Sequence, residues 1–372
     1  MKKLTIIYSF RDRDIPRVKR CLDSLEIQIY KDFEVIFVDY GSQLDLANKI
    51  QELIESYGFC RYIYSDTRGW PWNRSKALNI GIKQAKSDWV MLSDIDLIYG
   101  REVIESIITH SKDNLSLHAA CHYLPEKFNQ WDSIEKHIDT YGPPCFNALG
   151  LVLCIKRSLL LEIRGFDEFY QFWGGEDTDI ESRLNVLGIE TQWLDISDIP
   201  IYHQWHPANN HLAIGFMPSS YWDKLLAYNA DNEGDIIRNP SGWGEIIDLG
   251  SRKAVTNDNK QISFTVEFLV NSPENYASNN LYKNLAKTFN ALQSGESIII
   301  NDIFLKPSKG VFNFIIFLNK ILRKIGFEYS LVHNKNIVKD VFFLFLDNNS
   351  HYIDDFSYFD NSGQQTFLLI KK

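Results

Sequence analysis

The chain lacks the features that mark several classes of protein. Its 372 residues include only five cysteines, and no two of them have C-x-x-C spacing. This pattern suggests neither a disulfide framework nor a zinc site of the common kind. No run of about 18 uncharged apolar residues occurs, so we expect no membrane span. The apolar stretch before Arg11 is shorter than the roughly 7–15 residues of a signal-peptide core, and a cytoplasmic location is expected.

An excess of positive charge is also missing. There are 39 Lys and Arg residues against 48 Asp and Glu residues, a formal net charge of −9. This balance argues against binding to nucleic acid through the whole surface. The chain has no G-x-x-x-x-G-K phosphate loop, which disfavours the common NTPases. No internal repeat or low-complexity tract is evident.

What the chain does have is a strong α/β pattern. Apolar residues make up 45 % and aromatic residues 14 %, enough for a sizeable core. Strand-like and helix-like segments alternate over the first 110 residues, and the strands read as apolar on both faces. This pattern predicts a mostly parallel sheet covered by helices. The predicted strands are 3–9, 34–39, 61–65 and 89–94, and the predicted helices are 15–30, 44–57 and 74–86.

A change in composition near residues 239–244 predicts two domains. Residues 1–240 would form the larger one, and residues 241–372 a smaller accessory α/β domain. In the second domain we expect strands over 262–270 and 297–305 and helices over 279–293 and 311–325. Pieces of this domain faintly resemble a class I methyltransferase, which suggests a remnant of one. The apolar and basic stretch 311–327 is either a core helix or a helix lying on a membrane surface.

Two carboxylates follow one predicted strand. Asp94 and Asp96 are separated by one apolar residue, so an extended chain would direct both to one side. In α/β folds, ligands collect beyond the carboxyl ends of strands. Converging carboxylates there can hold a hard divalent cation that takes further oxygen ligands from a diphosphate. The pair therefore predicts a metal and nucleotide site.

A second acidic pair opens a predicted helix. Gly174 and Gly175 allow close backbone approach and positive φ, and Glu176 and Asp177 follow them. Acidic residues in a first helical turn also have a purely structural explanation, because they compensate the helix dipole. The preceding Trp173 and the two glycines favour a rigid loop that presents a carboxylate to an acceptor hydroxyl.

The segment IYHQWHPANN (201–210) carries two histidines, His203 and His206, three positions apart. Neutral imidazole is a good ligand for manganese and related metals. A structural role remains the alternative for either of them.

Several segments together resemble a known enzyme family. SFRDR (9–13), WNRSKALNIG (72–81), LSDIDL (92–97), GF (165–166) followed by WGGEDTDIESRL (173–184), and the late histidine His203 occur in the order and spacing of β-1,4-galactosyltransferases. The chain also resembles the related chondroitin-polymerizing transferases, which have a segment closely similar to YHQ (202–204). The match covers roughly residues 3–210. It implies a GT-A fold, a UDP-sugar donor, a manganese-type cofactor (Mn or Mg) and inversion at the anomeric carbon.

The resemblance also implies roles on the donor side. Arg11, Arg13 and Arg74 would contact the nucleotide and its phosphates. Asp39, at a strand end, would lie near the base. Asp94 would support the ribose or the metal.

The same resemblance assigns the metal and the acceptor. Asp96 and His203 would ligate the metal, with Pro200 where the family has a methionine ligand. His206 has no counterpart in the family.

On the acceptor side, Trp173 and Gly175 would line the pocket, Glu176 would hold the sugar and Asp177 would be the general base. Gln171 stands where the family has a tryptophan.

We therefore predict a UDP-sugar-dependent inverting hexosyltransferase, with galactose or N-acetylgalactosamine as the favoured sugar. The acceptor would be an oligosaccharide or a lipid-linked glycan in polysaccharide synthesis, with peripheral association at the inner face of the membrane left open. Two alternatives are a catalytically degenerate glycan-binding scaffold and a metal-dependent nucleotidyl or phosphoryl transferase.

Overall fold

The computed structural model describes ten stretches of the chain: residues 4–131, 134, 149–172, 174–194, 200–207, 219–256, 261–266, 274–302, 336–361 and 364–372. The chain divides into two compact units. The first comprises residues 1–68, 72–214 and 228–249, and the second comprises residues 69–71, 215–227 and 250–372. The domain boundary at residue 240 stays a prediction.

A seven-stranded sheet forms the centre of the first unit, in the order β3-β2-β1-β4-β8-β6-β9. Its strands are β1 (Leu4–Phe10), β2 (Phe33–Asp39), β3 (Cys60–Tyr64), β4 (Trp89–Ser93), β6 (Leu115–Ala119), β8 (Val152–Lys156) and β9 (Glu190–Leu194). All neighbouring pairs are parallel except those that β8 makes with β4 and β6. The prediction of a mostly parallel sheet is therefore confirmed.

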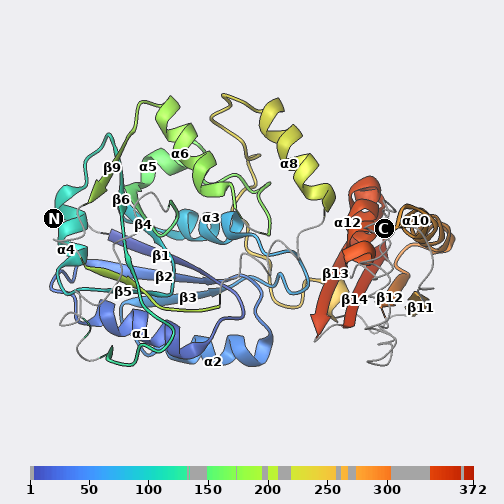
Figure 1. The fold of residues 1–372 in the computed structure, drawn as a ribbon, viewed down its shortest axis with the longest axis horizontal. Helices are drawn as coiled ribbons and strands as arrows, with labels where there is room; N and C mark the ends of the chain where they lie inside the picture. The colour runs from blue at the N-terminus through green and yellow to red at the C-terminus, as the bar shows by residue number, and fades with distance from the viewer. Residues whose placement is uncertain are drawn as a thin grey trace, which may run out of the picture. The chain divides into compact units, whose positions relative to one another are not determined.

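Helices cover both faces of this sheet (Figure 1). One face packs on α1 (Ile15–Glu26), α2 (Leu44–Glu55) and α4 (Val103–His110), and the other on α3 (Arg74–Gln84), α5 (Arg157–Glu162) and α6 (Glu176–Val186). Alternate residues of β1 show the division, because Ile6 and Tyr8 belong to the first core and Ile7 to the second. The strands are thus apolar on both sides because both sides are buried.

Local sequence signals explain where the important helices begin. The side chain of Asp14 caps α1 by accepting from the backbone N–H of Arg17, and Asn73 caps α3 in the same way through Lys76. Helix α6 starts after Gly175, whose φ of 97° is costly for any residue with a Cβ. The predicted helices and strands of the first 110 residues agree with these elements to within a few residues.

A small three-stranded sheet, in the order β5-β10-β7, was not predicted. Its strands are β5 (Leu97–Tyr99), β7 (His122–Tyr123) and β10 (Ile201–His203). β10 pairs antiparallel with β5, so that His203 lies opposite Leu97. This pairing brings a segment from beyond residue 200 next to the end of β4.

The second unit contains a four-stranded sheet in the order β11-β12-β14-β13. Its elements are β11 (Gln261–Val266), β12 (Ser297–Asp302), β13 (Ile353–Asn361), β14 (Gln364–Lys371), α9 (Lys253–Thr256), α10 (Glu274–Ala291), α12 (Asn336–Asn349) and the short 3-10 helix η2 (Ser350–Tyr352). The rings of Phe289, Phe345, Phe342 and Phe367 pack between the helices and the sheet. The α/β prediction for this part is confirmed, whereas the helix predicted over 311–325 lies outside the described residues.

Helix α8 (Ser219–Asp231) completes the described elements. Among the described residues no helix is both long and apolar enough to cross a membrane. The methyltransferase-like origin of the second unit and the membrane-surface alternative stay predictions.

Candidate functional site

The candidate site lies where the parallel strands β1, β2 and β4 end. Arg11 and Arg13 follow β1, Asp39 ends β2, and Asp94 and Asp96 follow β4. Because parallel strands end at the same edge, the fold itself gathers these polar residues. Two clusters of side chains form there, one around Asp96 and one around Arg74.

Asp96 is surrounded by cationic and imidazole side chains. It is 2 % exposed, and its Oδ2 accepts a hydrogen bond of 3.0 Å from Nη1 of Arg13. Nη1 of Arg17 lies 4.0 Å from the same oxygen. Nε2 of His206 is 3.4 Å from Oδ2, and Nε2 of His203 is 3.6 Å from Oδ1. We call these five residues the Asp96 cluster.

Backbone pairing explains why the histidines reach Asp96. The β5–β10 pairing fixes His203, and the N–H of Gln204 donates to the carbonyl of Asp96 at 2.9 Å. The side-chain amide of Gln204 also donates to the carbonyl of Arg17 at 3.0 Å. The buried Gln204 thereby ties three segments distant in sequence into one cluster.

The Asp96 cluster contains a donor set for a metal ion. Ligand atoms of Asp96, His203 and His206 all lie within 4.8 Å of one another. Burial lowers the pKa of His203, although Asp96 opposes that effect, so the imidazole favours its neutral, ligating form. A carboxylate and two imidazoles suit a divalent transition ion.

The second cluster consists of three carboxylates around Arg74, the first residue of α3. Its guanidinium donates to Asp177 at 2.8 Å, to Asp94 at 3.3 Å and to the carbonyl of Gly150 at 2.7 Å. Oε1 of Glu176 lies 3.8 Å from the same guanidinium. Burial alone would lower the pKa of Arg74, but Asp177, Asp94 and Glu176 raise it above its usual value. We call this group the Arg74 cluster.

The acids of the Arg74 cluster are hard to ionise together. The pKa of Glu176 is raised to about 7, mainly by burial. Asp177 contributes to this rise and Arg74 opposes it. Burial raises the pKa of Asp94 to about 6, with Arg74 opposing and Asp96 adding to the rise. One cation among three carboxylates leaves a net negative group.

Gly150 was not predicted to take part, yet it fixes the place of Asp177. A Cβ at this position would lie 2.1 Å from Oδ2 of Asp177, and its φ is +94°. Its carbonyl accepts from Arg74 as well. No sequence pattern marks Gly150, because its partners lie in α3 and α6.

Arg11 and Asp39 lie beside each other but outside both clusters. Nε of Arg11 donates to the carbonyl of Tyr40, and a second nitrogen donates to the carbonyl of Thr67 at 3.0 Å. Asp39 is fully buried, accepts from the N–H of Ser42 and the hydroxyl of Tyr62, and has a pKa raised by burial to about 6. Their donor-binding roles stay predictions.

The remaining predicted acceptor residues are partly described. Gly175 has positive φ as expected, and a Cβ there would meet the ring of Tyr170 at 2.6 Å. Glu176 and Asp177 occupy the first turn of α6, where the helix dipole favours negative charge. Trp173 lies outside the described residues.

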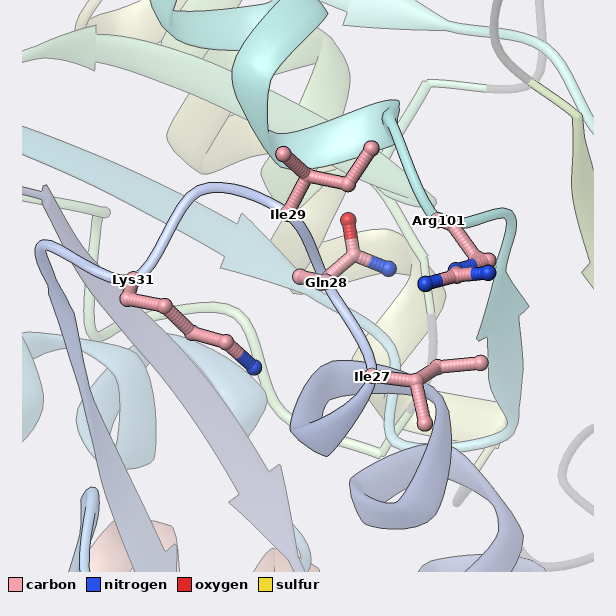
Figure 2. A pocket seen from close by; sticks show the side chains of 5 residues that line it. All are labelled: Ile27, Gln28, Ile29, Lys31 and Arg101. Carbon is pink, nitrogen blue, oxygen red and sulfur yellow. The ribbon is translucent and has the colours of Figure 1, made fainter.

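A surface cavity elsewhere does not belong to this site. It has a volume of about 620 Å³ and is lined by Ile27, Gln28, Ile29, Lys31 and Arg101 (Figure 2). These residues join the end of α1 to the start of β2 and follow β5, so the cavity lies at the amino end of the parallel strands. The amide of Gln28 is already bonded to the carbonyls of Ser24 and Gly100.

Comparison with known proteins supports the resemblance seen in the sequence. Residues 5–152 match the model of glycosyl transferase family 2, and residues 140–206 match that of the N-terminal domain of galactosyltransferase. β-1,4-Galactosyltransferase 1 of Bos taurus is 31 % identical over 123 residues, which cover 32 % of this chain and 26 % of that protein. Hyaluronan synthase of Pasteurella multocida is 27 % identical over 220 residues, which cover 48 % of this chain and 22 % of that protein.

Among solved structures, the chain matches a mannosyltransferase of Pyrobaculum calidifontis in complex with GDP-Man and Mn2+. The match has a TM-score of 0.42 and 15 % identity, and it covers 61 % of this chain and 64 % of that one. The structure of GalNAc-T7 with UDP, GalNAc and Mn2+ has a TM-score of 0.43 and 14 % identity. The match covers 63 % of this chain and 52 % of that one. The chain spans about a quarter of the length of the relatives that it matches in sequence. Residues 5–206 are thus glycosyltransferase-like, and the predicted GT-A fold and the resemblance to galactosyltransferases are confirmed.

Proposed function

We propose that this chain, with its glycosyltransferase-like residues 5–206, is a metal-dependent inverting enzyme that moves a hexose from a UDP-sugar to a sugar hydroxyl. Galactose or N-acetylgalactosamine is the favoured sugar, because galactosyltransferases are among its relatives. The acceptor would be an oligosaccharide or a lipid-linked glycan in polysaccharide synthesis, a role in keeping with the hyaluronan synthase relative. We place the reaction in the cytoplasm or at the inner face of the membrane.

One observation carries the proposal. Arg74 hydrogen-bonds both Asp94, beside the Asp96 cluster, and Asp177, at the start of α6. A single guanidinium therefore joins the carboxylate for an acceptor hydroxyl to Asp94, two residues before Asp96 in the cluster for a diphosphate. A site that transfers a group from a nucleotide to a hydroxyl needs both parts close together.

The donor would bind at the Asp96 cluster. Asp96 and His203 would hold a divalent ion, Mn2+ or Mg2+, which when bound neutralises the negative charge that grows on the leaving diphosphate. Arg13 is about one-third exposed, and among the described residues its hydrogen bond to Asp96 uses a single N–H, so other N–H donors could bind phosphate oxygens. Asp39 and Arg11 would lie toward the nucleoside, at the ends of β2 and β1.

The acceptor would be activated by Asp177. Its Oδ1 accepts from Arg74, and among the described residues no hydrogen bond is found to its Oδ2. Its side chain is 26 % exposed, so a hydroxyl can approach it. Asp177 would take the proton of the acceptor hydroxyl while the hydroxyl oxygen attacks the anomeric carbon and UDP leaves. This single displacement produces inversion without a covalent protein intermediate. Glu176 and Trp173 would hold the acceptor ring.

A donor screen tests this proposal. Release of UDP would be measured from UDP-galactose, UDP-N-acetylgalactosamine, UDP-glucose and UDP-glucuronate, with manganese and with EDTA. Slow hydrolysis of one donor that requires the metal is the expected result. Absence of both UDP release and UDP binding with every metal would overturn the proposal and favour a glycan-binding scaffold.

A further inference from the structure

His206 is the one member of the Asp96 cluster whose imidazole has no role in the proposed reaction. We propose that His206 is a third protein ligand of the metal, beside Asp96 and His203. This Asp-His-His set binds the ion without nucleotide and prefers Mn2+ to Mg2+. The inference deepens the proposed function and rests on it for the metal's role in the reaction.

The distances from the two imidazoles to Asp96 are close to those between ligands of one ion. The two Nε2 atoms lie 3.4 Å and 3.6 Å from the oxygens of Asp96. Ligand atoms about 2.1 Å from one ion lie roughly 3.0–3.4 Å apart at octahedral or tetrahedral angles. A direct charge-assisted hydrogen bond would be shorter, about 2.7–2.9 Å. The spacing is therefore closer to that of two ligands than to that of a bonded pair.

The ring of His206 is oriented as metal-bound histidines are. Its Nδ1 lies 2.9 Å from the carbonyl of Pro207, which can only accept, so Nδ1 carries the proton. In the neutral ring Nε2 then holds a lone pair, and that lone pair is directed at the carboxylate of Asp96. A histidine that ligates through one nitrogen almost always donates the other N–H to a carbonyl or carboxylate. A cation held between this lone pair and the carboxylate would be bound by both.

The carboxylate of Asp96 provides an independent sign of a ligand. Its Oδ1 is buried and has no hydrogen-bond partner in the part of the chain that the structure describes. The side chain is 3 % exposed, so bulk water has little access to this oxygen. An unpaired buried acceptor is destabilising, and more so when it is charged. Arg13 binds only Oδ2, and Oδ1 remains directed toward His203.

The chemistry of the donor set determines which ion it selects. Mg2+ prefers oxygen ligands and gives up water reluctantly. Two imidazole nitrogens with one carboxylate instead suit divalent transition ions and leave positions open for other ligands. The positive charges of Arg13 and Arg17 oppose the ion and favour a later diphosphate. We therefore expect a site that takes Mn2+ alone with modest affinity and binds it more tightly once UDP is present.

Metal binding can be tested without the reaction. The full chain, stripped with EDTA, would be titrated with Mn2+ alone while free Mn2+ is followed by electron paramagnetic resonance. We expect one ion per chain, an affinity at least about tenfold weaker in His206→Ala and His206→Gln, and little displacement by Mg2+ at about a hundredfold excess. His110→Ala, at the exposed end of α4, is the matched control and should bind as wild type does. Thermal unfolding without metal would show that both His206 variants fold.

A second measurement counts the nitrogens on the ion. Pulsed resonance of the bound metal should detect two histidine nitrogens in the wild type and one in His206→Gln. Equal affinity and equal nitrogen count in wild type and variants would overturn the inference, as would binding of Mn2+ that appears only with UDP. In either case UDP release in the donor screen would leave the proposed transferase intact. A chain that binds Mn2+ through His206 but releases no UDP from any donor would contradict the proposed function instead.

Discussion

Asp94 and Asp96 are two positions apart on one strand end, yet their surroundings are opposite. Asp96 faces two arginines and two histidines. Asp94 faces Arg74 together with the carboxylates of Glu176 and Asp177. One side of the site is therefore rich in positive charge, and the other is rich in carboxylates.

The contrast teaches how one strand can serve both halves of a transfer reaction. Positive charge around Asp96 is suited to a diphosphate that gains negative charge. On the other side, burial raises the pKa values of Glu176 and Asp94, and the proposed base Asp177 lies beside them on Arg74. The positive charge of Arg74 offsets the repulsion among the three carboxylates of Asp94, Glu176 and Asp177.

The largest effect on stability is expected for Arg74→Gln. The variant leaves three carboxylates without their cation, and breaking such a buried group typically costs about 3–5 kcal/mol. The loss should be greater at pH 8 than at pH 5, where protonation relieves the repulsion. Chemical unfolding at the two pH values would measure it, with Arg61→Gln as the control, because Arg61 is exposed and bonds only to Gln84 in the described structure. Equal losses at the two pH values would contradict the balance described here.

A smaller effect is expected for Gly150→Ala. The new Cβ would collide with Oδ2 of Asp177, and the left-handed backbone adds strain, for a total of about 1–3 kcal/mol. Gly188→Ala is the matched control, since Gly188 has a φ of +77° but a Cβ there would meet no atom within 4 Å among the described residues. The cost of Gly150→Ala should fall to that of the control in an Asp177→Ala background. Denaturant unfolding of the four variants would reveal it, and strictly additive costs would exclude the collision.

The smallest effect is a change in pH dependence for Glu176→Gln. The pKa of Glu176 is raised by burial to about 7, with Asp177, Arg74 and Asp94 as its charged neighbours. The folded state therefore favours the protonated acid, and its stability should fall as pH rises from about 4.5 to 7. Gln resembles the neutral form of Glu176. The melting temperature of the variant should therefore be a few degrees above that of wild type at pH 8 and equal to it at pH 4. A variant that melts below wild type at pH 8 would show that the ion pair of Glu176 with Arg74 outweighs the cost of burying the charged acid.

Much of the fold was readable because local patterns determined it. The apolar runs of β1, β2 and β4 lie within their own elements. The antiparallel strand β8 and the β5–β10 pairing were missed, since they depend on contacts between distant segments. The pattern of residues within one segment does not show which distant segment it will pair with.

The site was readable to the same extent. Asp94, Asp96, Arg74 and Asp177 were selected from motifs; the structure brings Arg74, Asp94 and Asp177 into contact, and the roles of all four stay predictions. Gly150 and Arg17 were missed because their roles exist only through side chains folded against them. His206 was noticed but left without a role, since only the β5–β10 pairing places it beside Asp96.

The most direct test of the account separates the two sides of the site in one variant. Asp177→Asn removes the proposed base but leaves the Asp96 cluster untouched, with Asp113→Asn as an exposed control. UDP release from the donor found in the screen and the affinity for UDP would be measured together. The account predicts a loss of turnover of about 10²–10⁴-fold with UDP binding near that of wild type. An equal loss of turnover and of UDP binding, or turnover that is unchanged, would contradict it.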